Sequence, residues 1–313
     1  MTDVRGSPPA LLTQRPSVPG CPVCGSTRES GRFDARDPHY GNPGRWWLRC
    51  CADCGSYSLD PMPSDTELLR MYPPESYYAF RIAPERPLRA GLRRVLGAAT
   101  ETREPAFGAP GSVLDFGCGA GDFLLKMKAA GWSCAGVEVS DAAVEVARSN
   151  GIRVERGVAT YPSSSFDYVR ANHSLEHVSN PREVLEDMYR VLKPGGTLFL
   201  GVPTNESQNA RLFGEHWWYL GTPVHPVTFS TRGLLALVRD VGFLPTRVST
   251  NSDFGSTAGS LQIFLNRNST RASSQGIIFA LKPLLLLGQW VAKLQDAFGV
   301  GDKLEIIARR PAA

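Results

Sequence analysis

The chain has 313 residues, of which 42% are hydrophobic and 20% charged, and its formal net charge at pH 7 is +4. These values are typical of a globular protein with one large core and a smaller module, and they exclude a fibrous or wholly disordered chain. So small a charge excess gives no support for nucleic acid as a partner. Residues 1–20 lack a basic stretch followed by an apolar one, and no run reaches the roughly 20 apolar residues of a bilayer span, so we expect a cytoplasmic protein without a transmembrane segment.

Changes in composition divide the chain into a disordered leader, a cysteine-rich module, a helical connector and a main domain, which span 1–19, 20–63, 64–110 and 111–313. The leader is rich in Pro and Ser, and the module is too short to bury a core of its own. In the connector, Ser64-Asp65 is a helix start for Thr66–Tyr72, and an Arg-rich helix is expected over 88–100.

Five of the seven cysteines lie between positions 21 and 54, and in a reducing compartment such clustering favours a metal site over disulfide bonds. Four of them form two Cys-x-x-Cys-Gly turns, each of which can present two thiolates to one ion. These four are Cys21, Cys24, Cys51 and Cys54. Four protein ligands leave no open coordination position, so the sequence predicts a structural zinc ion. Cys50 is an alternative third ligand, and surface thiols or a redox pair are the alternative to a metal.

From Pro110 onward, strand-like runs alternate with helical ones. Helices are expected over 122–130, 141–150, 181–192 and 231–241, and strands over 112–116, 133–139, 152–155, 166–171, 197–202, 243–250, 260–265 and 304–309. Such an alternation produces βαβ units, and it therefore predicts an α/β fold with a doubly wound parallel sheet.

The strand over 112–116 ends in a Gly-rich turn, Gly117-Cys118-Gly119-Ala120-Gly121, and a helix follows at once. A dinucleotide-binding turn has its third glycine where this chain has Asp122. Because a carboxylate at a helix N-terminus repels a pyrophosphate, a cationic ligand with an amino-acid end fits the turn better. Glu138 ends the next strand, where a carboxylate can accept hydrogen bonds from two ribose hydroxyls.

These residues resemble motif I and the acidic position that follows it in class I S-adenosylmethionine-dependent methyltransferases. The resemblance covers about Gly111 to Phe243 and extends, in the family's order, to Phe166-Asp167-Tyr168-Val169, Leu175-Glu176-His177-Val178 and Leu192-Lys193-Pro194-Gly195-Gly196. The leading Cys-x-x-Cys pairs resemble a bacterial subgroup that has an N-terminal zinc ribbon and is associated with the modification of sugars or secondary metabolites. The resemblance implies a Rossmann-like, seven-stranded sheet whose last strand is antiparallel, with the cofactor over the carboxyl ends of the strands.

The resemblance also implies which residues bind S-adenosylmethionine. The methionine end would lie on the Gly-rich turn, the ribose on the acidic residue after the second strand, the adenine beside the next residue, and the methyl group over the residues that follow the fourth strand. These positions are Asp115, Gly117, Gly119, Gly121, Glu138, Val139, Asn172 and His173.

Methyl transfer to a hydroxyl needs alignment of the reacting atoms and a base. An aromatic segment over 203–230 contains His225, and we expect this segment to form a lid over the acceptor with His225 as the base. His177 is the second candidate. His173, Glu176 and His177 resemble the Glu-x-x-Glu-His motif that binds a divalent metal in quinone-biosynthesis O-methyltransferases, with His173 in place of the first carboxylate. The alternative is that these histidines only pack the structure.

The sequence therefore predicts an S-adenosylmethionine-dependent methyltransferase that methylates oxygen in a small-molecule acceptor, such as a sugar or secondary metabolite. Two alternatives stay open: a nucleic-acid methyltransferase that grips phosphates, and a non-catalytic cofactor-binding scaffold. The first would use the zinc ribbon and an arginine patch of Arg81, Arg86, Arg89, Arg93 and Arg94. The chain lacks an Asn/Asp-Pro-Pro-aromatic base-methylation motif, and its intact Gly-rich turn argues against the scaffold.

An unusually apolar run over 277–287 lies in a helical insertion expected over 266–300, before the last strand. It predicts core or lid helices, and contact with an apolar acceptor or peripherally with a membrane surface is the alternative. The sequence leaves the oligomeric state open.

Overall fold

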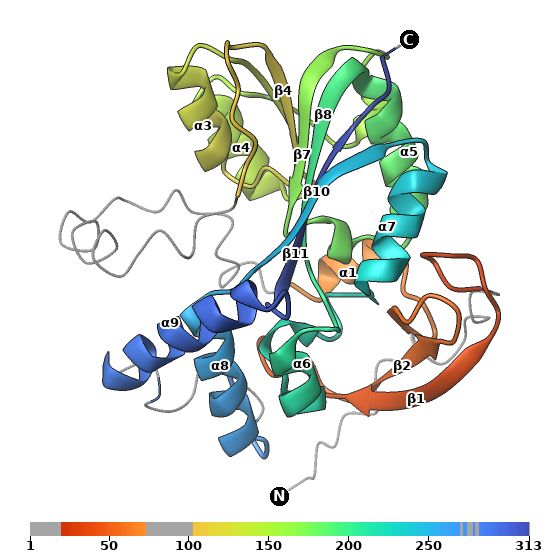
Figure 1. Ribbon diagram of the computed structural model, residues 1–313, viewed down its shortest axis with the longest axis vertical. Helices are drawn as coiled ribbons and strands as arrows, with labels where there is room; N and C mark the ends of the chain where they lie inside the picture. Colours follow the sequence, from red (N-terminus) through yellow and green to blue (C-terminus); the bar gives the residue numbers. More distant parts are fainter. Residues whose placement is uncertain (1–19, 73–102, 270–271, 274–277, 279–281, 313) are drawn as a thin grey trace, which may run out of the picture.

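The computed structural model describes residues 20–72, 103–269, 272–273, 278 and 282–312 (Figure 1). Three predicted features fall outside them: the leader, the Arg-rich helix with its arginine patch, and residues 277 and 279–281 of the apolar run. In the part of the chain that is described, no helix is long and apolar enough to cross a bilayer.

The main sheet has seven strands in the order β10-β11-β8-β7-β4-β5-β6. Their bounds are β4 Ser112–Phe116, β5 Ser133–Val137, β6 Arg153–Glu155, β7 Phe166–Asn172, β8 Leu192–Pro203, β10 Leu244–Asn251 and β11 Lys303–Arg309. Neighbours from β6 to β8 pair in parallel, whereas β11 is antiparallel to both β8 and β10. This arrangement confirms the predicted doubly wound, Rossmann-like sheet with an antiparallel last strand.

Helices cover both faces of the sheet (Figure 1). One face carries α3 (Asp122–Ala129) and α4 (Asp141–Ser149), and the other carries α5 (Pro181–Val191) and α7 (Thr231–Asp240). Because successive side chains of a strand point to opposite faces, each strand contributes side chains to two hydrophobic clusters, one on each face of the sheet. Val113 and Tyr168 pack on the α3 side and Leu114 and Val169 on the α5 side, all fully buried. Each such burial stabilises the fold by about 1.5–3 kcal/mol.

Helix α5 shows how local sequence sets the bounds of an element. The side chain of Asn180 caps it by accepting a hydrogen bond from the N–H of Glu183, and Pro181 occupies its first turn. Leu185 and Met188, three residues apart, lie on one side of the helix and are buried against the sheet.

The cysteine-rich module forms three antiparallel strands, β1 (Glu29–Ala35), β2 (Trp46–Cys51) and β3 (Tyr57–Leu59), and the main domain adds a fourth, β9 (Val227–Thr228). Strand β3 pairs antiparallel with β9. Leu48 and Leu59 of the module also share an apolar cluster with Trp217 and Leu220. Strand pairing and a common core therefore attach the module to the segment that precedes β9. The connector helix α1 (Asp65–Arg70) follows, and it begins with a capping box of Ser64 and Glu67.

The predicted strand over 260–265 is wrong, because these residues form the second half of helix α8 (Phe254–Leu265). Leu261, Ile263 and Leu265 alternate along the chain and so imitate a strand. A helix forms because Asp253 caps it by accepting a hydrogen bond from the N–H of Ser256 (2.9 Å). Helix α9 (Lys282–Ala297) lies within the predicted insertion and packs against α8.

Asp302, just before β11, is a buried carboxylate that fixes the segment 203–230 to the sheet. It accepts hydrogen bonds from Trp217 Nε1 (2.8 Å), Asn209 Nδ2 (2.7 Å) and Ser207 Oγ (3.0 Å). Asn209 belongs to helix α6 (Gln208–Phe213). Burial raises the pKa of Asp302, and these hydrogen bonds oppose the rise.

We expect Asp302→Ala to lower the free energy of unfolding by about 2–4 kcal/mol, because Trp217, Asn209 and Ser207 would each keep a buried donor without its acceptor. The matched control is Asp240→Ala, which removes an exposed ion pair with Arg182 (3.3 Å) and should cost less than about 1 kcal/mol. Urea denaturation followed by tryptophan fluorescence measures both. Equally small losses would show that the Asp302 network does not hold this segment.

Candidate active site

The Gly-rich turn after β4 has a backbone shape that glycine adopts more easily than other residues. The φ angles of Gly117, Gly119 and Gly121 are +73°, +54° and +94°. A Cβ on Gly117 would lie 2.3 Å from Oγ of Ser174, which follows β7. The turn therefore lies against the end of β7, at the carboxyl edge of the sheet where open α/β folds bind ligands.

Glu138, directly after β5, is buried and links the turn to the next strand. Its Oε2 accepts a hydrogen bond from the N–H of Gly119 (2.9 Å), and its Oε1 accepts from the N–H groups of Val139 and Ser140 (2.8 Å each). Three backbone amides thus orient the carboxylate, and the exposed side chain of Val139 lies next to it in the chain. The ribose and adenine contacts of Glu138 and Val139 stay predictions.

Asp115 and Arg170 form a buried ion pair that the sequence analysis missed. Arg170 Nη1 lies 2.9 Å from Asp115 Oδ1, and Arg170 Nε lies 2.6 Å from Glu104 Oε1. Burial raises the pKa of Asp115, and the charge of Arg170 opposes the rise. The two residues are in register on neighbouring strands. A signal in the sequence was the arginine that follows the buried pair Tyr168-Val169 within this strand. Since Arg170 already balances Asp115, contact of Asp115 with the methionine end stays a prediction.

Three side chains that are far apart in the sequence meet just beyond β7. Glu176 and His177 belong to the 3-10 helix η3 (Leu175–His177), and His225 lies on the segment that leads into β9. One potential ligand atom from each lies within 4.8 Å of the other two, and the ring centroids of His177 and His225 are 4.6 Å apart. The structure thus brings the two predicted catalytic histidines together, close to the Gly-rich turn.

Hydrogen bonds orient both imidazole rings. His225 Nδ1 lies 2.9 Å from the carbonyl oxygen of Tyr219, and His177 Nδ1 lies 2.9 Å from that of Val224. A carbonyl can only accept, so the contact with Tyr219 places the hydrogen of the neutral His225 ring on Nδ1 and leaves the lone pair on Nε2. The hydroxyl of Tyr72 lies 2.6 Å from His177 Nδ1, so the connector also reaches the cluster.

Burial and mutual contacts set the charge of this cluster. Burial, together with the neighbouring His177, lowers the pKa of His225 to about 3. Burial raises the pKa of Glu176, but contacts with His173, His177 and His225 outweigh it and bring the pKa to about 2. At neutral pH a carboxylate therefore lies beside a neutral His225 ring. Both oxygens of Glu176 are buried and accept no well-directed hydrogen bond from the described residues. A ring with so low a pKa binds protons weakly, which argues against His225 as a base acting alone.

His173 and Asn172, predicted to lie beneath the methyl group, are at the same edge of the sheet. His173 has a φ of +54°, stacks on Tyr219 with ring centroids 5.7 Å apart, and places Nδ1 3.3 Å from Glu176 Oε1. Asn172 ends β7, and its side chain packs against Gly201. A Cβ added to Gly201 would lie 2.4 Å from Asn172 Oδ1. Their contact with a cofactor stays a prediction.

The four cysteines predicted to bind zinc converge within the module. The Sγ atoms of Cys21 and Cys54 are 3.6 Å apart, and those of Cys24 and Cys51 are 3.5 Å apart. A disulfide would need about 2.05 Å, whereas thiolates on a tetrahedral zinc ion, at 2.3 Å from the metal, are roughly 3.8 Å apart. Cys50 lies outside this cluster, because neighbouring residues of a strand point to opposite faces. The distances and the soft thiolate set both fit a zinc ion.

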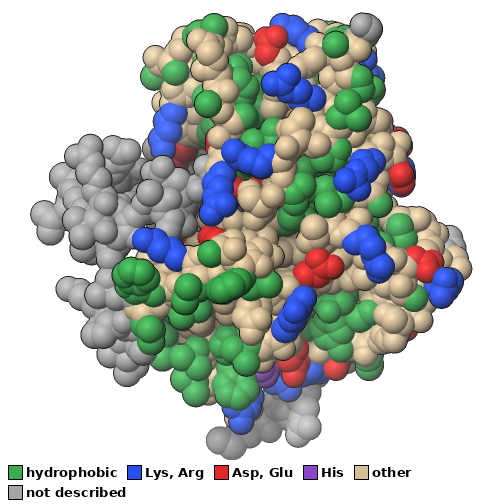
Figure 2. Space-filling view, in the orientation of Figure 1, with side chains coloured by type: hydrophobic (Ala, Val, Ile, Leu, Met, Phe, Trp, Pro, Cys, Tyr) green, Lys and Arg blue, Asp and Glu red, His purple; other side chains and the backbone are tan. Residues whose placement is uncertain are grey.

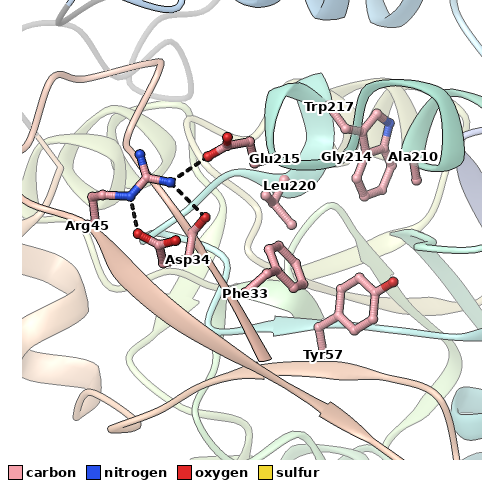
Figure 3. A pocket seen from close by; sticks show the side chains of 9 residues that line it. All are labelled: Phe33, Asp34, Arg45, Tyr57, Ala210, Gly214, Glu215, Trp217 and Leu220. Carbon is pink, nitrogen blue, oxygen red and sulfur yellow. Dashed lines mark hydrogen bonds and ion pairs between the residues drawn. The ribbon is translucent and has the colours of Figure 1, made fainter. Parts of the chain in front are cut away.

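A cavity of about 450 Å³ lies between the module and the segment before β9 (Figure 3). The rings of Phe33 and Tyr57 line one part of it, and Arg45 closes one end by donating hydrogen bonds to Glu215 Oε2 (2.7 Å) and to the carboxylate of Asp34. None of the predicted cofactor or catalytic residues lines this cavity. It is therefore separate from the edge of the sheet that carries the histidine cluster.

Comparison with known proteins adds the family. A family model described as a methyltransferase domain matches residues 86–247. An uncharacterized 37.1 kDa protein in transposon TN4556 of Streptomyces fradiae is 32% identical over 191 residues, which are 54% of each chain. The ubiquinone biosynthesis O-methyltransferase of Pseudomonas paraeruginosa is 34% identical over 112 residues, which are 33% of this chain and 48% of the relative. The chain thus spans about half the length of the curated relatives it matches.

Solved structures of methyltransferases are also similar to this chain. One, an S-adenosylmethionine-dependent methyltransferase from Thermotoga maritima, has 23% sequence identity and a TM-score of 0.43 over 66% of this chain and 84% of its own. Another, from Archaeoglobus fulgidus, has 19% identity and a TM-score of 0.44 over 71% of this chain and 92% of its own.

We expect Glu138→Ala to weaken S-adenosylmethionine binding by about 1.5–3 kcal/mol, the size of lost hydrogen bonds to a charged group. The variant removes the predicted ribose acceptor and releases the N–H of Gly119 from its partner. Glu145→Ala, on the exposed side of α4, is the matched control and should bind the cofactor normally. Titration calorimetry measures both affinities, and equal affinities for Glu138→Ala and the wild type would refute the assigned cofactor site.

Proposed function

We propose that this chain, which belongs to the methyltransferase-domain family, is a class I S-adenosylmethionine-dependent methyltransferase that methylates a hydroxyl oxygen of a small-molecule acceptor. The observation that carries this proposal is the convergence of Glu176, His177 and His225, just after Ser174, which lies against Gly117 of the Gly-rich turn. A relative that is an O-methyltransferase by name supports oxygen as the methylated atom. In the reaction, the acceptor oxygen bonds to the methyl carbon, the carbon–sulfur bond breaks and leaves its electron pair on the sulfur of S-adenosylhomocysteine, and the hydroxyl proton passes to His225 or to water.

The cofactor and the acceptor would meet at the end of β7. Gly117 touches Ser174, which is two residues before Glu176. A cofactor whose methionine end lies on the turn would therefore have its methyl group close to the histidine cluster, with Asn172 and His173 beneath it. The segment 203–230 would close over the acceptor, since it carries His225 and contacts the module through His39 Nε2 and the carbonyl oxygen of Trp218 (2.9 Å).

A hydroxyl is a weak nucleophile until its proton is removed or its oxygen is polarised. The donor set of Glu176, His177 and His225 fits a divalent cation, because two imidazole nitrogens and a carboxylate are ligands that such ions take. The buried Glu176 oxygens, which lack directed hydrogen bonds, support the fit. When bound, a cation would lower the pKa of the acceptor hydroxyl. The chain's own residues would hold the ion: Glu176 supplies negative charge, and the two rings supply neutral nitrogen.

We also propose that Cys21, Cys24, Cys51 and Cys54 hold a structural zinc ion that supports the acceptor side of the site. The second Cys-x-x-Cys turn abuts the start of α7: Ser230 N donates to Ser56 Oγ (3.1 Å), and Asn205 Nδ2 donates to the carbonyl oxygen of Gly55 (2.8 Å). Zinc would fix this turn, and the turn would fix β9 and His225. With four protein ligands the ion has no open position, so it would do no chemistry.

We expect His225→Gln to leave S-adenosylmethionine affinity unchanged and to lower turnover by about 10² to 10⁴-fold. The readout is S-adenosylhomocysteine formation with an acceptor found by screening catechols, phenols and sugars. The control is His216→Gln, because the His216 ring lies 5.5 Å from Phe264 and outside the cluster; it should keep normal turnover.

Two further measurements separate a cation from a base. With a cation, Glu176→Gln should lose as much turnover as His225→Gln, and wild-type activity should vanish with a chelator and return with Mg²⁺ or Mn²⁺. If His225 is the base alone, chelator has no effect and the residual activity of His225→Gln rises with pH. Normal turnover of His225→Gln would contradict both mechanisms.

For the module, we expect one zinc ion per chain in wild-type protein purified without chelator, and in Cys50→Ser. Cys51→Ser, which changes the neighbouring residue, should lose the ion, since it removes one of four thiolates. Elemental analysis by mass spectrometry gives the zinc content. Wild-type protein without zinc, or loss of zinc on changing Cys50 but not Cys51, would overturn the ligand assignment.

A further inference from the structure

Helix α9 is turned so that apolar side chains face solvent and polar ones face the protein. Leu287, Trp290 and Leu294 are 60%, 68% and 58% exposed, and Phe298, just after the helix, is 78% exposed. These positions are spaced by three or four residues and so form one stripe along the helix. The opposite side of the helix buries Gln289 and Gln295.

Specific contacts fix this orientation of α9. Gln295 Nε2 donates a hydrogen bond to Asn209 Oδ1 (3.2 Å), within the network around Asp302. Asp296 Oδ2 accepts from the N–H of Ser252 (3.0 Å). Rotating the helix to bury its apolar stripe would break these hydrogen bonds and leave buried polar groups without partners. The exposed stripe is therefore a property of the folded chain.

The end of α8 enlarges the apolar surface with the exposed side chains of Phe264 and Leu265. We call these residues the α8–α9 patch: Phe264, Leu265, Leu287, Trp290, Leu294 and Phe298. Figure 2 shows hydrophobic side chains gathered at the lower left, where Figure 1 places α8 and α9. An exposed apolar area of this kind marks an interaction surface.

The charged side chains beside the patch indicate which kind of partner it binds. Arg267 lies over the ring of Phe264 (5.2 Å), and Lys293 lies over the ring of Trp290 (5.6 Å). In the described residues 254–269 and 282–301, the one acidic residue is Asp296, whose side chain is buried. In a symmetric contact, a second copy of the chain would bring another positively charged patch against this one, and the like charges oppose such a contact. An anionic lipid surface accepts both the cations and the aromatic rings.

We propose that the α8–α9 patch docks the protein peripherally on a membrane that carries anionic lipid. Its aromatic rings would lie at the boundary between the lipid headgroups and the acyl chains, where aromatic side chains are favoured. Arg267 and Lys293 would contact lipid phosphates. Helix α8 also touches the lid, because Gly259 lies against the Trp218 ring, where a Cβ would be 2.1 Å from a ring carbon. Docking would therefore place the lid at the membrane surface.

The test is co-sedimentation of the full chain with vesicles of phosphatidylcholine, alone or mixed equally with phosphatidylglycerol. We expect binding to the mixed vesicles that weakens with added salt. The triple variant Trp290→Ser, Leu294→Ser, Phe298→Ser and the double variant Arg267→Glu, Lys293→Glu should each reduce the partition coefficient by about tenfold or more. The control is Trp47→Ser, which removes an exposed tryptophan on β2 of the module and should bind like wild type.

Circular dichroism and S-adenosylmethionine affinity check that each variant is folded. No binding of wild type to the mixed vesicles would overturn the proposal, and so would equal binding by wild type and the folded triple variant. A wild-type dimer that the triple variant converts to monomer, seen by analytical ultracentrifugation without vesicle binding, would assign the patch to a second copy instead. None of these results depends on the acceptor, so they are independent of the proposed O-methylation.

Discussion

The pairing of β3 with β9 is the interaction on which the position of His225 depends. Strand β9 has two residues, too few to hold a position unaided, and hydrogen bonds from Ser230 and Asn205 to the second Cys-x-x-Cys turn secure it. His225 lies two residues before β9, so its approach to His177 depends on the same pairing. The cysteine-rich module therefore helps to place His225, because it supplies the sheet to which β9 is the fourth strand.

A buried charge is costly unless it is paired. The three buried carboxylates at the carboxyl edge of the sheet differ in the partners they have. Asp115 is balanced by Arg170 from the neighbouring strand. Glu138 accepts hydrogen bonds from three backbone N–H groups, which are uncharged partners. Glu176 has imidazoles around it but no well-directed hydrogen bond in the described part of the chain. Of the three carboxylates, Glu176 is thus the one whose oxygens accept no well-directed hydrogen bond from the described residues.

Polar packing also decides the outer surface of the molecule. Asp302 accepts hydrogen bonds from Asn209 of α6 and from Trp217, and Asn209 extends the same network to Gln295 on α9. Satisfying these buried groups determines which side of α9 faces inward, and the apolar side is left exposed as a result. One network therefore fixes both the segment 203–230, which carries His225, and the direction in which the α8–α9 patch faces.

The sequence by itself determined most strands and helices of the main domain, the Gly-rich turn and the Cys-x-x-Cys turns, because hydrophobic periodicity and glycine spacing are local properties that act within a few residues. The antiparallel last strand was predicted only from the resemblance to a known family. It failed at 260–265, where alternation imitated a strand and a cap at Asp253 with packing against Trp218 made a helix. Tertiary structure alone decided that Arg170 balances Asp115 and that His225 meets His177 and Glu176. These contacts join residues far apart in the chain, and their distances follow from strand register and from the docking of the module, which no local pattern encodes.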